Sequence, residues 1–129
     1  VVLPEGMTHL PDKAFLNRTS LVSVAGHLSR LSRPRSLASI GSGAFERCSS
    51  LSTIDLPASL VAINNYAFRG CSALSSVTLP AGLTSIGSSA FNACFSLTRV
   101  TLPAALTSID HEAFANCSSL TSVAFPVGL

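Results

Sequence analysis

The chain has 129 residues, of which 47% are hydrophobic and 11% are charged, and its formal net charge is +2. This length suits one domain of ordinary size. The charged fraction lies well below the roughly 25% of an average globular protein, so we expect much of the chain to be buried. So small a net charge does not indicate nucleic-acid binding, and no apolar run approaches the ~20 residues of a membrane helix. We therefore expect neither a nucleic-acid partner nor membrane insertion.

An internal repeat with a constant period organises the chain. Four phenylalanines recur with a period of 23, each preceded by an alanine and followed at constant offsets by a cysteine, a leucine, a branched residue and a proline. These phenylalanines and cysteines are Phe45, Phe68, Phe91 and Phe114, and Cys48, Cys71, Cys94 and Cys117. A fixed period of this length is typical of a solenoid, because one unit cannot bury its apolar face alone and stacked units share a continuous core. We predict a single solenoid domain over residues 1–129, with about five repeats.

The first unit departs from this period. The interval from Phe15 to Phe45 is 30, instead of the 23 that separate later phenylalanines. Offsets counted forward from Phe15 match as far as Val24, and offsets counted back from Phe45 match as far as Pro34. The sequence therefore predicts an irregular repeat with an insertion at about 25–33. Insertions in solenoids usually bulge outward on one face, which is often the binding face.

Each regular unit is predicted to contain two short strands and a turn. Around Ser76, Val77 and Thr78 the apolar residues alternate with small polar ones, which is the pattern of a half-buried strand. Pro80 ends this strand because it has no N–H to donate. A second extended stretch over 83–86 turns back along the other side, and we expect the Ala-Phe-x-x-Cys piece to form one helical turn. The predicted class is an α/β solenoid of mostly short parallel strands with little helix.

Both ends of the chain match the middle of a repeat. Residues 1–7 and 123–129 carry no polar cap, although isolated solenoids need one to shield their open edges. We therefore expect the ends to be covered by further repeats or by another chain. In the first case we expect the chain to be a segment of a longer repeat array, and in the second a subunit held inside a larger assembly.

The unit Leu-x-x-Val-x-Leu-Pro-x-x-Leu-x-x-Ile-x-x-x-Ala-Phe-x-x-Cys-x-x resembles the BspA-like, or treponemal-type, leucine-rich repeat. The resemblance covers residues 41–129 closely and 1–40 more loosely, since Arg18 replaces an expected cysteine and Arg33 an expected strand leucine. It implies a curved, right-handed superhelix with a parallel sheet on its concave side. It also implies a surface adhesion or host-interaction role for a class of proteins that are not enzymes. The resemblance suggests the cell surface, whereas unpaired cysteines would also suit a reducing intracellular compartment.

The four cysteines share one offset, which places them in a column beside the phenylalanines. A small apolar thiol that faces the core fits this place, since free cysteine is among the most buried residue types. The alternatives are a metal site and an occasional disulfide between neighbouring units. Metal-binding cysteines normally come in close C-x2-C pairs, which this sequence lacks, and a disulfide would distort the strand ladder. We predict buried structural thiols, with no metal and no cofactor.

No catalytic constellation is recognisable in the sequence. The histidines, His9, His27 and His111, occupy different offsets in different units. His111 lies between Asp110 and Glu112, and we interpret this group as a solvated turn. No nucleophile elbow, phosphate-binding loop or zinc-protease motif occurs. We therefore predict no catalytic residues and no enzyme activity.

The outward strand positions are the first candidate binding surface. Their offsets place them in rows across neighbouring strands of the expected concave sheet. These candidates are Thr53, Asp55, Ser76, Thr78, Arg99 and Thr101. Most are small and hydroxylic, and the face lacks the aromatic residues that often anchor tight interfaces. Tyr66, the only tyrosine, is expected to be an exposed contact outside this face.

An arginine-bearing segment over residues 27–35 is the second candidate. Its candidate contacts are Arg30, Arg33 and Arg35, and no acidic residue lies between Lys13 and Glu46. The segment is either a solvated loop or a docking site whose arginines make forked pairs with carboxylates of a partner. In the second case, alanine at the three arginines should weaken binding in a salt-dependent way.

These features predict a non-catalytic protein–protein interaction module for recognition, adhesion or scaffolding, which uses the concave sheet and the arginine-bearing insertion. The alternative is an architectural accessory subunit that is packed permanently within a large multiprotein complex. A stable soluble monomer would favour the first interpretation, whereas constant co-purification with one assembly would favour the second.

Overall fold

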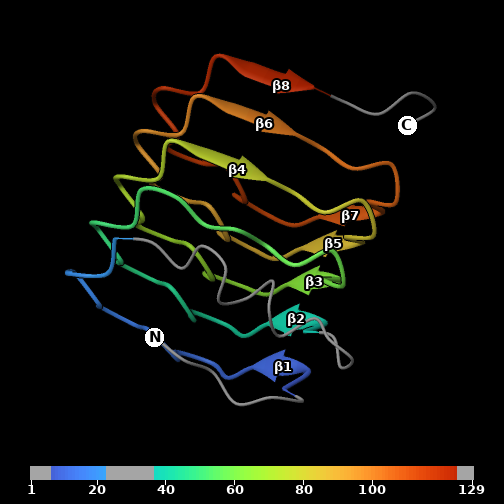
Figure 1. Ribbon diagram of the computed structural model, residues 1–129. Coiled ribbons are helices and arrows are strands. Elements are labelled where there is room, and N and C mark those ends of the chain that lie inside the picture. The colour runs from blue at the N-terminus through green and yellow to red at the C-terminus, as the bar shows by residue number, and fades with distance from the viewer. Residues whose placement is uncertain (1–6, 23–36, 125–129) are drawn as a thin grey trace.

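The computed structural model describes residues 7–22 and 37–124. Successive turns of the chain stack along one axis, from β1 (His9–Leu10) at one end to β8 (Ser122–Ala124) at the other (Figure 1). The strands between them are β2 (Ser39–Ile40), β3 (Ala62–Ile63), β4 (Ser76–Thr78), β5 (Ser85–Ile86), β6 (Arg99–Thr101) and β7 (Ser108–Ile109). No helix occurs in the described residues.

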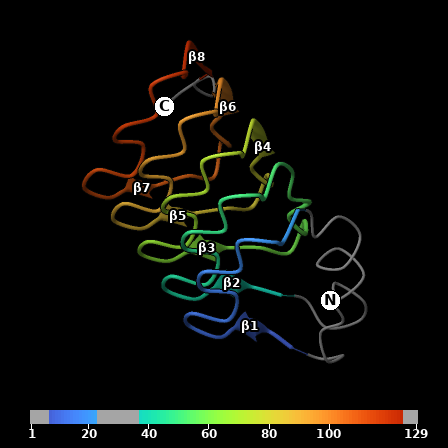
Figure 2. The same ribbon diagram turned by 90° about the vertical axis from the view of Figure 1, so that its left-hand side faces the viewer.

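The strands form two parallel sheets, and regular turns contribute one strand to each. β1, β2, β3, β5 and β7 make a five-stranded sheet, and β4, β6 and β8 make a three-stranded sheet. Figure 2 shows β4, β6 and β8 along one edge of the solenoid and the loops that follow β2, β3 and β5 on the side away from it. This confirms the predicted solenoid of short parallel strands. The five strands of the larger sheet mark four complete turns, so the repeat count differs slightly from the five predicted.

The register of the strands preserves the period read from the sequence. Residues paired between β3 and β5 and between β5 and β7 are 23 apart, whereas those paired between β1 and β2 are 30 apart. The longer offset holds as far as Val22, whose carbonyl accepts the N–H of Ser52, and the shorter one begins at Ala38, whose carbonyl accepts the N–H of Val61. The predicted insertion at about 25–33 lies outside the described residues.

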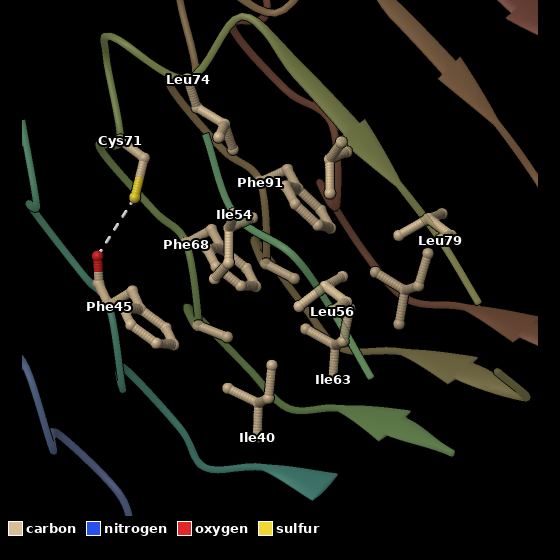
Figure 3. Packing of buried hydrophobic residues seen from close by; sticks show 14 of the residues in the cluster. Ile40, Phe45, Ile54, Leu56, Ile63, Phe68, Cys71, Leu74, Leu79 and Phe91 are labelled. Carbon is tan, nitrogen blue, oxygen red and sulfur yellow. Dashed lines mark hydrogen bonds between the residues drawn. The ribbon is translucent and has the colours of Figure 1, made fainter. Parts of the chain in front are cut away.

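A stack of phenylalanine rings runs along the core (Figure 3). The stacked rings are Phe15, Phe45, Phe68, Phe91 and Phe114. Neighbouring centroids are 5.1–5.3 Å apart and the interplanar angles are 2–13°. Aromatic pairs at this separation contribute about 0.5–1.5 kcal/mol beyond the burial of their area. The branched side chains of β1 to β6 lie in one buried cluster, whereas Ile109 of β7 and Val123 of β8, at the last turn, are 43% and 39% exposed.

The segments around these phenylalanines are not the helical turns that the sequence suggested. The residues two before and two after Phe68 are Tyr66 and Gly70, and both have a left-handed backbone, with φ of 61° and 77°. The same two positions are left-handed in each of the other described turn segments: Lys13 and Asn17, Gly43 and Arg47, Ser89 and Ala93, and Glu112 and Asn116. A right-handed helical turn cannot contain this alternation.

The alternating backbone links each segment to the next repeat. The N–H groups of Tyr66, Phe68 and Gly70 donate to carbonyls of the following repeat at 2.7–2.9 Å. The N–H groups between them close turns within the segment, as Arg69 does to the carbonyl of Tyr66. A helical turn would direct successive N–H groups along its own axis and leave few for the neighbour. The expected helical turn is therefore wrong, because the backbone of these segments forms a further ladder along the solenoid.

Ala93 is a residue at which the energetic cost of the left-handed backbone can be measured. It has φ of 61° where the preceding repeat has Gly70, and a left-handed residue with a Cβ costs about 1–2 kcal/mol. Ala93→Gly removes this cost, partly offset by about 0.4–1 kcal/mol from the freer unfolded chain. We expect a net gain between zero and about 1.5 kcal/mol in the free energy of unfolding, measured by urea denaturation. Ala115→Gly, where φ is not positive, should instead lower stability by about 0.5–1 kcal/mol, and equal effects of the two changes would contradict the explanation.

Candidate functional site

The three-stranded sheet presents two rows of outward side chains. Pairing between β4 and β6 places Ser76 beside Arg99 and Thr78 beside Thr101. All four side chains are exposed, whereas Val77 and Val100, the middle residues of β4 and β6, point into the core. This alternation follows from the two-residue period of a strand. The structure therefore brings four of the predicted contact residues together on one solvent-facing patch.

Thr53 and Asp55 continue the rows beyond β4. Both flank the buried Ile54, at the same offsets in their repeat as the outward residues of β4, and Asp55 is exposed. Thr53, Asp55 and Thr78 line one shallow depression that is open to solvent. All six predicted sheet contacts thus lie on one continuous face. We call these six residues the sheet face.

The hydroxyl groups of this patch differ from those elsewhere in the repeat. Thr84 and Thr107 donate their hydroxyls to the carbonyls of Val61 and Thr84, one repeat earlier, at 3.1 Å. Thr98 and Thr121 make the corresponding bonds along the neighbouring column at 3.3 Å. These hydroxyls belong to the scaffold, because they hold neighbouring repeats together.

The sheet-face hydroxyls make no such bond within the described part of the chain. Thr78 and Thr101 point outward from strands whose backbone groups are already paired. Arg99 likewise forms no ion pair with any described acidic residue. The donors and acceptors of these side chains are consequently available to a partner. Arg30, Arg33 and Arg35 lie outside the described residues.

The cysteines form the buried column that their shared offset predicts. The Sγ of Cys71 donates to the carbonyl of Phe45 at 3.1 Å (Figure 3), and Cys48, Cys94 and Cys117 make the same bond one repeat back. All four thiols are free, and Cys117 alone is half-buried. Burial, followed by repulsion from the neighbouring Cys117, raises the pKa of Cys94 to about 12. The prediction of structural thiols is confirmed. Among the described residues, no three histidine, cysteine or acidic side chains gather closely enough to hold a metal ion.

This burial predicts slow and ordered thiol chemistry. The thiolate is the reactive form, and burial raises the pKa of Cys71 above that of an ordinary thiol. In native protein at mildly alkaline pH we expect a disulfide reagent to modify the half-buried Cys117 first and the buried cysteines much more slowly. In denaturant all four should react at the rate of free cysteine. Absorbance of the released thiol reports the rates, and rapid modification of all four in native protein would overturn the buried column.

The two described histidines, His9 and His111, lie far apart. His9 is in β1, whereas His111 follows β7 at the other end of the stack (Figure 1). The Nε2 atom of His111 lies 3.1 Å from an Oε1 atom of Glu112, and both side chains are exposed. The backbone N–H of His111 donates to Asp110. The interpretation of this group as a solvated turn is confirmed.

A second group of exposed side chains lies on the turn segments. Tyr66 is 41% exposed, and the guanidinium carbon of Arg69 lies 5.5 Å from the centroid of its ring. The Nη1 atom of Arg69 is 3.6 Å from the Oε2 atom of Glu46 in the preceding repeat. Sequence reasoning identified Tyr66 but not its two neighbours. The available signal was that Glu46 and Arg69 share one offset in consecutive repeats, which places opposite charges next to each other in one column.

The fold is a leucine-rich-repeat solenoid. It is defined by the stacked parallel strands, the column of phenylalanines and the threonine hydroxyls that bond to the preceding repeat. Residues 24–129 match the family described as BspA type leucine rich repeat region, in six copies. The chain therefore belongs to the BspA-type leucine-rich repeat family. No helix in the described residues has the length and apolar character that crossing a membrane requires.

Solved structures of bacterial proteins share the whole architecture. The chain is 35% identical to a leucine rich repeat protein of T. pallidum, with a TM-score of 0.87, over 100% of this chain and 59% of that one. It is 36% identical to a leucine-rich repeat protein from Bacteroides ovatus ATCC 8483, with a TM-score of 0.79, over 92% of this chain and 29% of that one. It is 26% identical to a leucine rich cell surface protein from Faecalibacterium prausnitzii A2-165, with a TM-score of 0.71, over 97% of this chain and 31% of that one. The chain thus spans at most 59% of each of these proteins. No curated protein matches it.

Proposed function

We propose that this chain is a non-catalytic protein-binding module whose contact surface is the sheet face. One observation carries the proposal: neighbouring strands expose Ser76, Thr78, Arg99 and Thr101 in register, with side chains that the scaffold does not use. Leucine-rich repeats of this family are generally interaction modules rather than enzymes. The resemblance to a cell surface protein supports a role in recognition or adhesion.

The chemistry of the sheet face favours a polar, shape-dependent interface. Small hydroxyl side chains leave the face nearly flat, so a partner can approach the strands closely and exchange hydrogen bonds with Thr78 and Thr101. Arg99 offers a planar fork of donors that matches a carboxylate or a row of carbonyls. This charge would fix the orientation of a partner more than it would add affinity.

Substitution on the sheet face tests this proposal. A variant with Thr78→Arg and Thr101→Arg places two long cations on the face, while both positions are exposed and outside the core. A variant with Ser96→Arg, at a turn position outside the core, serves as the matched control. Partners captured from the native source are identified by mass spectrometry, and their affinities for the three proteins are then measured.

We expect the sheet-face variant to lose at least about tenfold in affinity, and the control to bind as the wild type does. Undiminished binding by the sheet-face variant would contradict the proposal. The same material separates recognition from an architectural role, since a protein that is always recovered within one large assembly would favour the accessory-subunit alternative. Alanine at Arg30, Arg33 and Arg35 tests the proposed contribution of the insertion, and a loss of affinity that diminishes at high salt would support it.

A further inference from the structure

We propose that the turn segments of the first three repeats form a second docking surface, which binds an acidic segment of a partner protein. We define this turn face as the exposed side chains of residues 11–18, 41–48 and 64–71. The loops of these segments lie on the side of the solenoid away from β4 and β6 (Figure 2). The turn face is therefore distinct from the sheet face and extends the proposed function without depending on it.

Tyr66 places an exposed aromatic side chain on the turn face. Its position requires a left-handed backbone, and the preceding repeat meets that requirement with Gly43. Tyr66 holds φ of 61° with a large side chain that is 41% exposed. Neither the local backbone nor the core explains an aromatic residue here. Exposed tyrosine beside arginine is the composition that dominates binding energy at protein interfaces.

Arg69 is held in place beside this ring. Its guanidinium lies 5.5 Å from the centroid of Tyr66 and 3.6 Å from the carboxylate of Glu46. The Arg69 side chain nevertheless remains 45% exposed, whereas that of Glu46 is only 16% exposed. The stack and the ion pair restrict the arginine before any partner arrives, so binding costs less conformational entropy. The donors that Glu46 does not occupy can make a forked pair with a carboxylate of the partner.

The glycines of the turn segments extend this surface toward β1. A Cβ placed on Gly43 would lie 3.0 Å from Oε1 of Glu46 and 3.6 Å from Cγ of Lys13. Both side chains therefore flank the gap that this glycine leaves. Gly70 has the same relation to Arg47, whose Cγ would lie 3.4 Å from its Cβ. The glycines thus make room for charged side chains beside them.

The charges of the turn segments identify the partner. Residues 11–18, 41–48 and 64–71 contain four cations and two acidic residues: Lys13, Arg18, Arg47 and Arg69, with Asp12 and Glu46. The next segment, 87–94, contains no charge, and 110–117 contains two acidic residues. Nucleic acids bind best to a continuous basic stripe. The turn face is only modestly positive and has acidic residues among its cations, so it fits an acidic protein segment better.

Peptide selection followed by substitution tests the turn face. A random peptide library is displayed on phage and selected against the whole chain at low ionic strength, and the affinity of an enriched peptide is measured by calorimetry. The diagnostic variant is Tyr66→Gly, which copies Gly43 of the preceding repeat and suits the left-handed backbone, so it should keep or raise the thermal midpoint. Arg69→Ala is the second variant, and Arg99→Ala on the sheet face is the control.

We expect enrichment of peptides rich in aspartate and glutamate, whose affinity falls at least about tenfold in Tyr66→Gly and in Arg69→Ala and stays unchanged in Arg99→Ala. Peptides without an excess of acidic residues would overturn the inference, as would equal binding by Tyr66→Gly. Loss of binding in Arg99→Ala alone would place the peptide on the sheet face, which overturns this inference while supporting the proposed function.

Discussion

Replacing Phe68 with alanine is expected to lower the free energy of unfolding by about 3–5 kcal/mol. The ring is fully buried and stacks between Phe45 and Phe91, with centroid separations of 5.2 and 5.1 Å. Its removal leaves a cavity in the middle of the column and breaks contacts with both neighbouring repeats. In a solenoid these nearest-neighbour contacts supply much of the stability. Equilibrium denaturation followed by circular dichroism measures the loss.

Phe95 provides the matched control for this experiment. It lies in the turn that directly follows the segment of Phe91, yet its side chain is 50% exposed and lies outside the core. Phe95→Ala should therefore change stability by no more than about 0.5 kcal/mol, as for most surface substitutions. Comparable losses in Phe68→Ala and Phe95→Ala would show that the phenylalanine column does not stabilise the stack.

Replacing Gly87 with alanine is expected to cost about 1–3 kcal/mol, the usual range for an overpacked position. A Cβ at this position would lie 2.6 Å from both the backbone nitrogen and the Oδ1 atom of Asn65. That Oδ1 atom accepts the N–H of Ser88 at 2.8 Å, so the clash also disturbs a bond between repeats. Because the blocking atoms include backbone, no rotation of a side chain can relieve the contact. The midpoint of thermal unfolding should fall accordingly.

Gly82 is the control for this second change. Nothing lies within 4 Å of a Cβ built on Gly82. Gly82→Ala should leave stability unchanged, or raise it slightly by restricting the unfolded chain. If Gly87→Ala changed stability as little as Gly82→Ala, successive repeats would not approach each other as closely at this turn as the structure shows.

The period of the sequence predicted most of the fold. Residues at one offset occupy one column, so the spacing of Phe45, Phe68 and Phe91 already implied stacked rings, and that of Cys71 and Cys94 implied buried thiols. The alternation at Ser76–Thr78 likewise predicted which side chains face outward. These inferences succeeded because a solenoid converts sequence spacing directly into spatial position.

The conformation of the turn segments could not be predicted in the same way. Ala-Phe-x-x-Cys is compatible with a helical turn, and the left-handed residues that exclude it include Arg47 and Ala93, which favour a right-handed backbone. The hints at the true geometry were Gly43 and Gly70, with Asn17 and Asn116, since glycine and asparagine tolerate a left-handed backbone. The deciding interaction is the hydrogen bonding of alternate N–H groups to the next repeat, which depends on the stack rather than on any one segment.

Of the two candidate surfaces, one could be predicted from sequence spacing and the other could not. The offsets predicted the rows of the sheet face, because a strand's outward positions follow from its pattern alone. The pairing of Arg69 with Tyr66 and Glu46 was not predicted, since it depends on the left-handed backbone that aims these side chains. A column that carries opposite charges in consecutive repeats is therefore a useful signal in other chains of this kind.

Amide hydrogen exchange, measured on the chain alone and in complex with a captured partner, shows directly whether the sheet face binds protein while the columns beneath it serve the scaffold. We expect the partner to slow exchange in residues 53–55, 76–78 and 99–101. If the partner remains bound while these three segments exchange as fast as in the free chain, the sheet face is not the binding surface.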